Sequence, residues 1–95
     1  YEAVVANKAL DEDVGQFTIA GKLCESGDIL VRDTKLPVVS TGDIIAMPAC
    51  GAYCVALSSN YNALPRPAIV MVNQGEAHLI RRRENYQDLM GLDID

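Results

Sequence analysis

The chain has 95 residues, of which 49% are hydrophobic and 22% are charged, and its formal net charge is −5. A chain of this length supports one hydrophobic core, so we expect a single domain over residues 1–95. The negative charge leaves no electrostatic footprint for nucleic acid, and no apolar run reaches the roughly 18–20 residues that a membrane span needs. We therefore expect no nucleic-acid partner and no membrane partner.

Turn signals recur roughly every 8–15 residues, with short β-branched or apolar runs between them. The strands that we expect, in chain order, are Glu2–Asn7, Gln16–Lys22, Ile29–Asp33, Asp43–Pro48, Ala68–Asn73 and Glu76–Arg83. This spacing of short strands and turns predicts an all-β domain.

The clearest predicted hairpin joins Ile69–Val72 to Ala77–Ile80 through the loop 73–75. Asn73 and Gly75 are the residues of this loop that tolerate the positive φ of a short hairpin turn. Pro48 has no N–H to donate, so it should end the pairing of the strand that contains it.

Two segments have a helical pattern. Ala52–Leu57 is short and rich in alanine. Glu84–Leu92 places Tyr86, Leu89 and Met90 at i, i+3 and i+4, which predicts an apolar stripe on one side of a helix.

Cys24 and Glu25 lie in the segment Gly21–Asp28, which follows a predicted strand and ends in a Ser-Gly-Asp turn signal. We expect both residues at a strand end that faces a site. A carboxylate beside a thiol disfavours the thiolate by like-charge repulsion, which argues against a nucleophilic cysteine. The pattern suits a thiol that stays protonated and acts as a general acid. The alternative is a small residue packed before a turn.

Tyr53 follows Gly51 at the predicted start of a helix. A glycine lets the backbone approach a ligand closely, and a tyrosine here can present its hydroxyl to an anion held near the N–H groups. The alternative is an ordinary core tyrosine with a satisfied hydroxyl.

The three cysteines are an odd number in a chain without a secretory signal, which favours a reduced, cytoplasmic compartment. Cys50 and Cys54 are four residues apart and can share one face of a helix. There is no second pair of this kind and His78 is the lone histidine, so we expect no metal site. His78 alternates with apolar neighbours and should be a solvent-facing strand residue.

Four segments carry the most specific patterns in the chain. They are Gly21–Leu30, Gly51–Tyr53, Ser59–Asn62 with Pro65–Pro67, and Arg81–Leu89. In this order and at these spacings they resemble the C-terminal blocks of bacterial diaminopimelate decarboxylases. The run Cys-Glu-Ser-Gly-Asp at positions 24–28 is the most discriminating of them.

The resemblance implies a fold-type-III enzyme, in which an N-terminal TIM barrel carries pyridoxal 5'-phosphate on a lysine. This chain would be its C-terminal β-domain, a Greek-key-like β-barrel or sandwich with one or two short helices. Lys8, Lys22 and Lys35 match no cofactor-lysine motif of the family, so we expect the Schiff-base lysine on the barrel. The chain starts at Tyr1 without a methionine, and we expect it to be a piece of the longer enzyme.

The resemblance also implies roles for three residues in the conversion of meso-2,6-diaminopimelate to L-lysine and CO2. Cys24 would be the catalytic proton donor to the carbon that loses its carboxylate, and Glu25 would bind the distal end of the amino-acid substrate. Tyr53 would contact both the cofactor phosphate and the substrate. The family's site forms at a homodimer interface, with Cys24 and Glu25 reaching the partner's barrel. Tyr1 is either the tyrosine of the family's Arg-Pro-x-Leu-Tyr substrate motif or a neighbour of it.

Two alternatives stay open. A sister decarboxylase of ornithine, arginine or carboxynorspermidine would share the architecture, but as a rule such relatives lack the Cys-Glu-Ser form of the motif. A non-catalytic β-domain that mediates assembly would be expected to have lost the catalytic blocks, which are intact here.

Overall fold

The computed structural model describes residues 2–94, so the two interpretations of Tyr1 lie outside the described residues. The chain divides into two compact units, with the boundary between Ala56 and Leu57. The prediction of one domain over residues 1–95 stays a prediction. Within residues 2–94, no helix combines the length and the apolar composition needed to cross a membrane.

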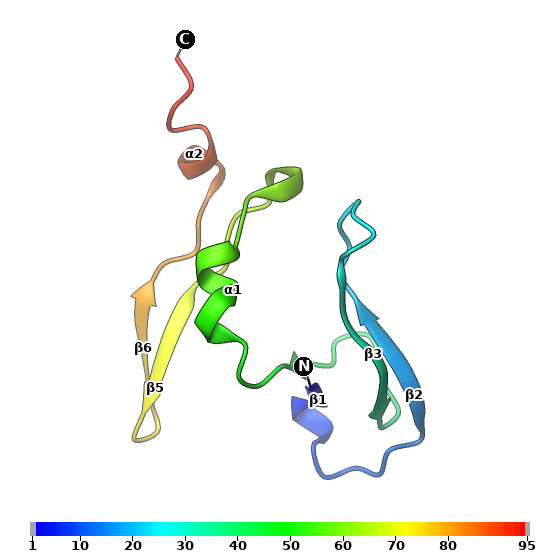
Figure 1. The fold of residues 1–95 in the computed structure, drawn as a ribbon. Coiled ribbons are helices and arrows are strands. Elements are labelled where there is room, and N and C mark those ends of the chain that lie inside the picture. The colour runs from blue at the N-terminus through cyan, green and yellow to red at the C-terminus, as the bar shows by residue number, and fades with distance from the viewer. Residues whose placement is uncertain (1, 95) are drawn as a thin grey trace. The chain divides into compact units, whose positions relative to one another are not determined.

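The first unit is built mainly from short antiparallel strands (Figure 1). Its elements are β1 (Val4–Val5), β2 (Gly15–Ala20), β3 (Ile29–Leu36), β4 (Ile45–Ala46) and helix α1 (Gly51–Leu57), whose last residue crosses into the second unit. The longest pairing is the β2–β3 hairpin, in which Gly15 lies opposite Leu36 and Ala20 lies opposite Ile29. Its register shifts on both sides of Ile19, so the ladder is irregular close to the loop that joins the two strands.

The core of the first unit is small. Val5 of β1 is fully buried and Leu36 at the end of β3 is 3% exposed. Along β2, Phe17 and Ile19 are half-buried while their neighbours are exposed, which is the period-2 alternation of a strand with one covered face.

A polar clamp formed by Asn7, Lys8 and Asp43 holds the segment after β1 against the turn before β4. The Lys8 ammonium donates to Asp43 Oδ2 at 2.7 Å, and Asn7 Nδ2 donates to Asp43 Oδ1 at 2.8 Å. The Ser40 N–H also donates to this carboxylate, at 2.9 Å, and Asn7 Oδ1 accepts from the Ile44 N–H at the same distance. These hydrogen bonds lower the pKa of Asp43 to about 2, with the Lys8 contact as the largest cause.

The second unit centres on the hairpin of β5 (Ile69–Asn73) and β6 (Glu76–Arg81), followed by the short helix α2 (Tyr86–Leu89). The predicted hairpin is confirmed, with Asn73 opposite Glu76 in the last pair. Positive φ occurs at Gln74 (51°) and Gly75 (77°), so the turn has two residues, as in a type I′ turn. The expectation of positive φ at Asn73 was wrong, because Asn73 is itself a paired strand residue.

Helix α2 has one turn and depends on its cap. The Asn85 side chain accepts from the Asp88 N–H at 3.0 Å, and the Asp88 carboxylate accepts from the Asn85 N–H at 2.9 Å, which together form a capping box. Arg82 donates two hydrogen bonds to Asp88, at 2.7 and 2.8 Å, and this pairing lowers the pKa of Asp88.

The predicted all-β class with short helices is confirmed, while several predicted boundaries were wrong. Asn7 was predicted to be in a strand but lies in a turn of 3-10 helix, Ala6–Lys8, where its side chain is hydrogen-bonded to Asp43 and to the Ile44 N–H. The strand predicted to end at Asp33 runs on to Leu36. The helix predicted from Glu84 begins at Tyr86.

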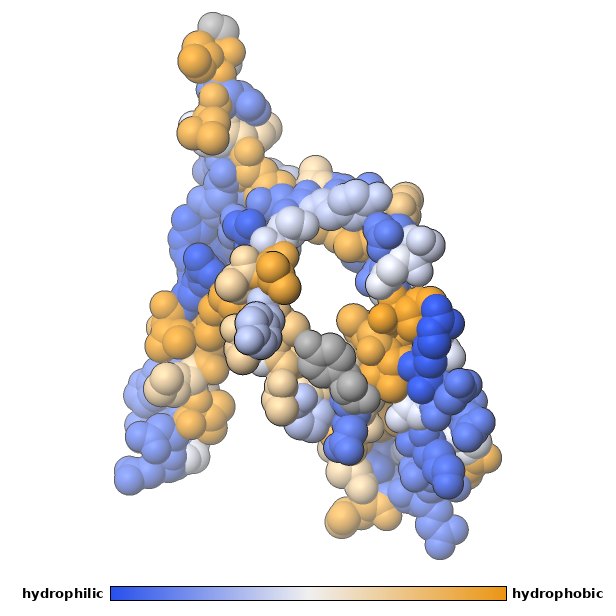
Figure 2. All heavy atoms as spheres, viewed as in Figure 1, coloured by the Kyte–Doolittle hydropathy of each residue, from blue (hydrophilic) through white to orange (hydrophobic). Residues whose placement is uncertain are grey.

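Apolar side chains remain on the surface of the β5–β6 hairpin (Figure 2). The exposed fractions of its large apolar residues include 49% for Val70, 63% for Leu79 and 72% for Val72. His78 on β6 is also exposed, as predicted, and lies 3.7 Å from the Glu76 carboxylate.

Candidate functional site

Cys24 and Glu25 lie in the loop that joins β2 to β3, at the tip of the hairpin (Figure 1). Both residues are exposed in this chain, so Cys24 is not packed before the turn as the alternative interpretation expected. The prediction that they follow the end of a strand is confirmed, since β2 ends at Ala20.

Asp28 is the last residue of the run 24–28, and the sequence patterns gave it no role beyond the turn. It donates from its N–H to the Glu25 carbonyl at 3.0 Å, and its carbonyl accepts from the Gly21 N–H at 2.8 Å. Its carboxylate oxygen Oδ2 accepts from the Leu23 N–H at 2.8 Å. The turn residues Ser-Gly-Asp were a valid signal for the turn itself, but they carry no signal for these particular contacts.

Two glycines of the loop lie directly against carboxylates. A Cβ atom added to Gly21 would overlap the Asp28 carboxylate, and a Cβ added to Gly27 would lie 2.5 Å from Glu25 Oε2. The Asp28 carboxylate is short and hydrogen-bonded, so Gly21 is needed for this close packing, whereas the exposed Glu25 side chain could move aside from a Cβ at position 27.

Tyr53 lies in the first turn of α1 and is 74% exposed. It is therefore not a core tyrosine, and its phenol is accessible to a ligand. A Cβ added to Gly51, at the start of the helix, would meet no atom within 4 Å, so the space beside the helix start is open.

The first unit contains an apolar hollow of about 260 Å³. It is lined by Ile29, Leu30, Met47, Cys50 and Cys54. The first two of these residues directly follow the loop of Cys24, and the two cysteines flank Tyr53 in the chain. The hollow therefore lies between the base of the loop and the helix that carries the tyrosine.

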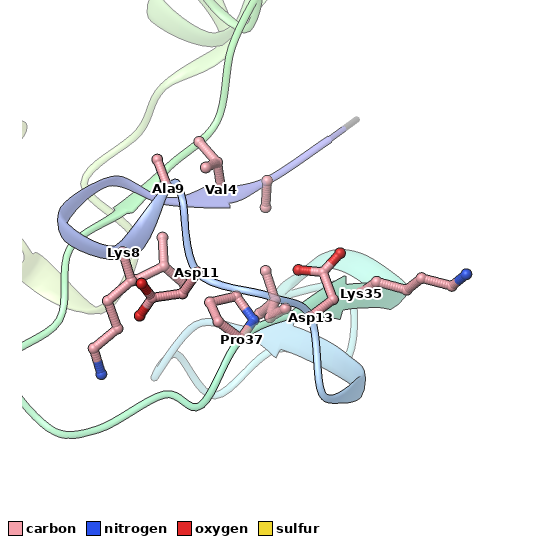
Figure 3. Close-up of a pocket in the computed structure, with 10 residues that line it drawn as sticks. Val4, Lys8, Ala9, Asp11, Asp13, Lys35 and Pro37 are labelled. Carbon is pink, nitrogen blue, oxygen red and sulfur yellow. The ribbon is translucent and has the colours of Figure 1, made fainter.

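A second hollow, of about 230 Å³, lies beside β1 and the end of β3 (Figure 3). Lys8, Asp11, Asp13 and Lys35 contribute its charged groups. Lys8 is held by Asp43 and also donates to the Val38 carbonyl at 2.9 Å. An ion-paired ammonium is a poor amine nucleophile, so the contacts of Lys8 give it a structural role. Figure 3 shows the Lys35 side chain extending away from that of Lys8.

In the second unit, Glu84 accepts hydrogen bonds from two residues that are distant in the chain, and the sequence patterns did not predict these contacts. Its carboxylate oxygen Oε1 accepts from the Arg66 N–H at 2.7 Å and from Asn60 Nδ2 at 3.0 Å. These contacts lower the pKa of Glu84, with the Asn60 hydrogen bond as the largest cause. Next to this centre, Asn62 and Ala63 both have positive φ, at 58° and 57°, so the loop holds an unfavourable backbone conformation.

The segment Ser59–Asn62 with Pro65–Pro67 and the segment Arg81–Leu89 were recognised separately in the sequence, and Glu84 brings parts of the two together. No local pattern predicts which carboxylate joins them. Across residues 2–94, no group of three or more histidine, cysteine, aspartate or glutamate side chains is placed to hold a metal ion.

Comparison with known proteins gives one family match. Residues 1–51 match the family model described as pyridoxal-dependent decarboxylase, C-terminal sheet domain. This range contains β1 to β4 and the Cys24–Glu25 loop, and it ends at the first residue of α1.

Individual relatives cover nearly the whole chain. A diaminopimelate decarboxylase of Synechocystis is 53% identical over 93 residues, which are 98% of this chain and 20% of that protein. A diaminopimelate decarboxylase of Bacillus subtilis is 48% identical over 94 residues, which are 99% of this chain and 21% of that protein. This chain thus spans about a fifth of the length of these relatives.

A solved structure has the same fold. The crystal structure of the diaminopimelate decarboxylase of M. jannaschii in complex with L-lysine is 41% identical, with a TM-score of 0.83. The match covers 90% of this chain and 20% of that one.

Proposed function

Because this chain belongs to the C-terminal sheet domains of the pyridoxal-dependent decarboxylases, we propose that the protein that contains it converts meso-2,6-diaminopimelate to L-lysine and CO2. The observation that carries the proposal is the exposed Cys24–Glu25 pair on a hairpin tip, in a chain that is 53% identical to a diaminopimelate decarboxylase. A solved relative binds L-lysine, which is diaminopimelate without one carboxyl group.

Cys24 is the proton donor of the proposed reaction. When a carboxylate leaves the substrate as CO2, its place on the α-carbon must be taken by a proton. A neutral thiol can transfer that proton, and the exposed position of Cys24 allows the α-carbon to approach it. The thiolate that remains is reprotonated from solvent before the next turnover.

Glu25 binds the distal end of the substrate. Diaminopimelate carries an amino group at each end, and the end that does not react must be recognised as a charged group. A carboxylate beside the proton donor can pair with the distal ammonium, while the α-carbon of the reacting end lies near Cys24.

In this proposal, the chain contributes one contact to pyridoxal 5'-phosphate, at the cofactor's phosphate group. The exposed phenol of Tyr53 on α1 has open space beside Gly51 and can donate a hydrogen bond to a phosphate oxygen. When bound, the cofactor supplies an electron sink for the C–C bond that breaks. The lysine that holds it belongs to the N-terminal TIM barrel of the same polypeptide in this proposal.

The proposed assembly is a cytoplasmic homodimer, in which the hairpin tip of one subunit reaches the barrel of its partner. Because the two side chains are exposed at the end of a hairpin, they can complete an active site whose other residues belong to a second subunit. The odd number of cysteines favours a reducing compartment.

The test is a comparison of substrates with the purified full-length protein loaded with cofactor. We expect lysine and CO2 in equal amounts from meso-diaminopimelate, with a higher kcat/KM than for ornithine, arginine or carboxynorspermidine. A preference for one of these three would contradict the proposed substrate. Absence of decarboxylation of all four would contradict the proposed activity and favour an assembly domain.

A further inference from the structure

The two chain neighbours of Cys24 are both hydrogen-bonded to Asp28. Leu23 donates from its N–H to the Asp28 carboxylate, and Glu25 accepts at its carbonyl from the Asp28 N–H. We propose that Asp28 is a positioning residue, which holds the Cys24 thiol and the Glu25 carboxylate in the orientation that proton transfer and substrate binding require. This inference rests on the function proposed above and extends it to a residue outside the reacting groups.

Three groups of Asp28, its carbonyl, its carboxylate and its N–H, each form a hydrogen bond with a different residue of the loop. Its carbonyl accepts from Gly21 and so adds one more hydrogen bond to the β2–β3 ladder beyond the last pair, Ala20 and Ile29. Its carboxylate accepts from Leu23, and its N–H donates to the carbonyl of Glu25. The peptide segment that contains Cys24 is thereby anchored on both sides.

The anchoring carboxylate is itself confined. Asp28 is half-buried, and its carboxylate occupies the space that a side chain at position 21 would need. The Leu23 N–H therefore meets an acceptor whose position is restricted by the backbone of Gly21. On the other side of the loop, the Glu25 carboxylate lies close against Gly27.

Without this anchor, the loop would be an exposed tip beside an irregular stretch of the ladder. Such a loop samples many conformations, and each one places the thiol differently relative to the substrate. Misplacement of a reacting group by about 1 Å can reduce a rate about 100-fold. Asp28 thus acts on the reaction through Cys24 and Glu25, without contacting the substrate.

The experiment compares Asp28→Ala and Asp28→Asn with Cys24→Ala in the full-length, cofactor-loaded enzyme. Asp28→Ala removes the acceptor for Leu23, and we expect kcat to fall about 10- to 100-fold. The solvent deuterium isotope effect on kcat should rise, because proton transfer becomes a slower step. Asp28→Asn keeps an oxygen acceptor and should restore most of kcat. Asp11→Ala, at an exposed aspartate of the same unit, is the matched control.

A double variant separates positioning from a general structural role. If Asp28 acts on protonation through Cys24, adding Asp28→Ala to Cys24→Ala should cause no further loss of kcat. Gly21→Ala, which displaces the Asp28 carboxylate, should reproduce the effect of Asp28→Ala. The absorption spectrum of the bound cofactor and the Tm should remain at the wild-type values in Asp28→Asn.

The outcomes distinguish this inference from the function on which it rests. Wild-type kcat in Asp28→Ala, or losses that multiply fully in the double variant, would overturn the role of Asp28 while leaving Cys24 as the proton donor. An unchanged kcat in Cys24→Ala would remove Cys24 as the proton donor and overturn this inference with it. Absence of decarboxylation by the wild-type enzyme would overturn the proposed function itself.

Discussion

Cys24 and Glu25 are adjacent in the chain and both exposed, although side chains of one strand alternate between its two faces. Their position in a loop, after the end of β2, removes this constraint and lets both point to the same ligand. A thiol and a carboxylate can then act on opposite ends of one substrate. Two predictions test these roles separately.

In the full-length enzyme, Cys24→Ala should lower kcat by about 10²–10⁴-fold, the range typical for loss of a general acid. Cofactor binding should be unaltered, because Cys24 is not among the residues that contact the cofactor in our proposal. Steady-state kinetics and the absorption spectrum measure the two effects. Cys54→Ala, at another exposed cysteine, is the control. Equal kcat in Cys24→Ala and wild type would remove Cys24 from the mechanism.

Glu25→Gln should lower kcat/KM for meso-diaminopimelate by at least about tenfold, because the amide cannot pair with the distal ammonium as a charged group. The spectrum of the cofactor should stay the same. Glu76→Gln, an exposed glutamate on the β5–β6 hairpin, should leave kcat/KM unaltered. If both variants match wild type, Glu25 is a turn residue and the substrate specificity resides elsewhere in the protein.

At the scale of the elements, carboxylates connect segments that are distant in the chain. The Asp43 carboxylate is hydrogen-bonded to Lys8 and Asn7, which precede it in the chain by more than 30 residues. The Glu84 carboxylate is hydrogen-bonded to the Arg66 N–H and the Asn60 amide. Strands as short as β1 and β4 have few ladder hydrogen bonds of their own. Such side-chain contacts therefore determine where the short strands meet.

The clamp at Asp43 predicts a pH dependence. The folded pKa is about 2, below the ordinary value of about 3.9, so the contribution of this carboxylate to stability is complete above pH about 4. It is lost as the pH falls from about 4 to about 2. Carboxyl NMR of this chain should give a titration midpoint near 2 for Asp43, and Lys8→Met should raise that midpoint. A wild-type midpoint near 4 would contradict the clamp.

Glu84→Ala should loosen the loop between α1 and β5. It leaves the Arg66 N–H and the Asn60 amide without their acceptor, while the Nε atom of Arg66 already lacks a partner. We expect hydrogen exchange at the Arg66 amide to become at least about tenfold faster. Glu76→Ala serves as the control. Unaltered exchange at Arg66 would show that Glu84 does not hold this loop.

At the scale of the whole molecule, our proposal gives this chain only part of a catalytic site. It spans about a fifth of its relatives, and its described core contains few fully buried apolar residues, such as Val5. Large apolar side chains remain exposed in both units. We expect the remainder of the enzyme to provide the cofactor lysine.

The isolated chain should therefore form no covalent adduct with pyridoxal phosphate. Lys8 is ion-paired, and we expect neither Lys22 nor Lys35 to act as the cofactor lysine. After incubation with the cofactor and reduction with borohydride, mass spectrometry should find no stoichiometric label, whereas the full-length protein should carry one. A stoichiometric adduct on any of these three lysines would contradict the expectation.

The sequence by itself determined the all-β class, the β5–β6 hairpin and the position of Cys24 and Glu25 after the end of a strand. These features depend on local patterns: alternation along strands, turn residues between them, and a short run of chemically distinctive residues. The sequence also predicted the family, which the match of residues 1–51 confirms.

Only the tertiary structure decided which side chains bind which backbone groups. No local pattern assigns contacts to Asp28, Asp43 or Glu84, and each becomes the centre of several hydrogen bonds once the chain folds. The same applies to Asn7, which was predicted to be in a strand and instead bends the chain to reach Asp43. The physical reason is that a hydrogen bond requires its two partners within about 3 Å, and the folded path of the chain sets that distance between segments.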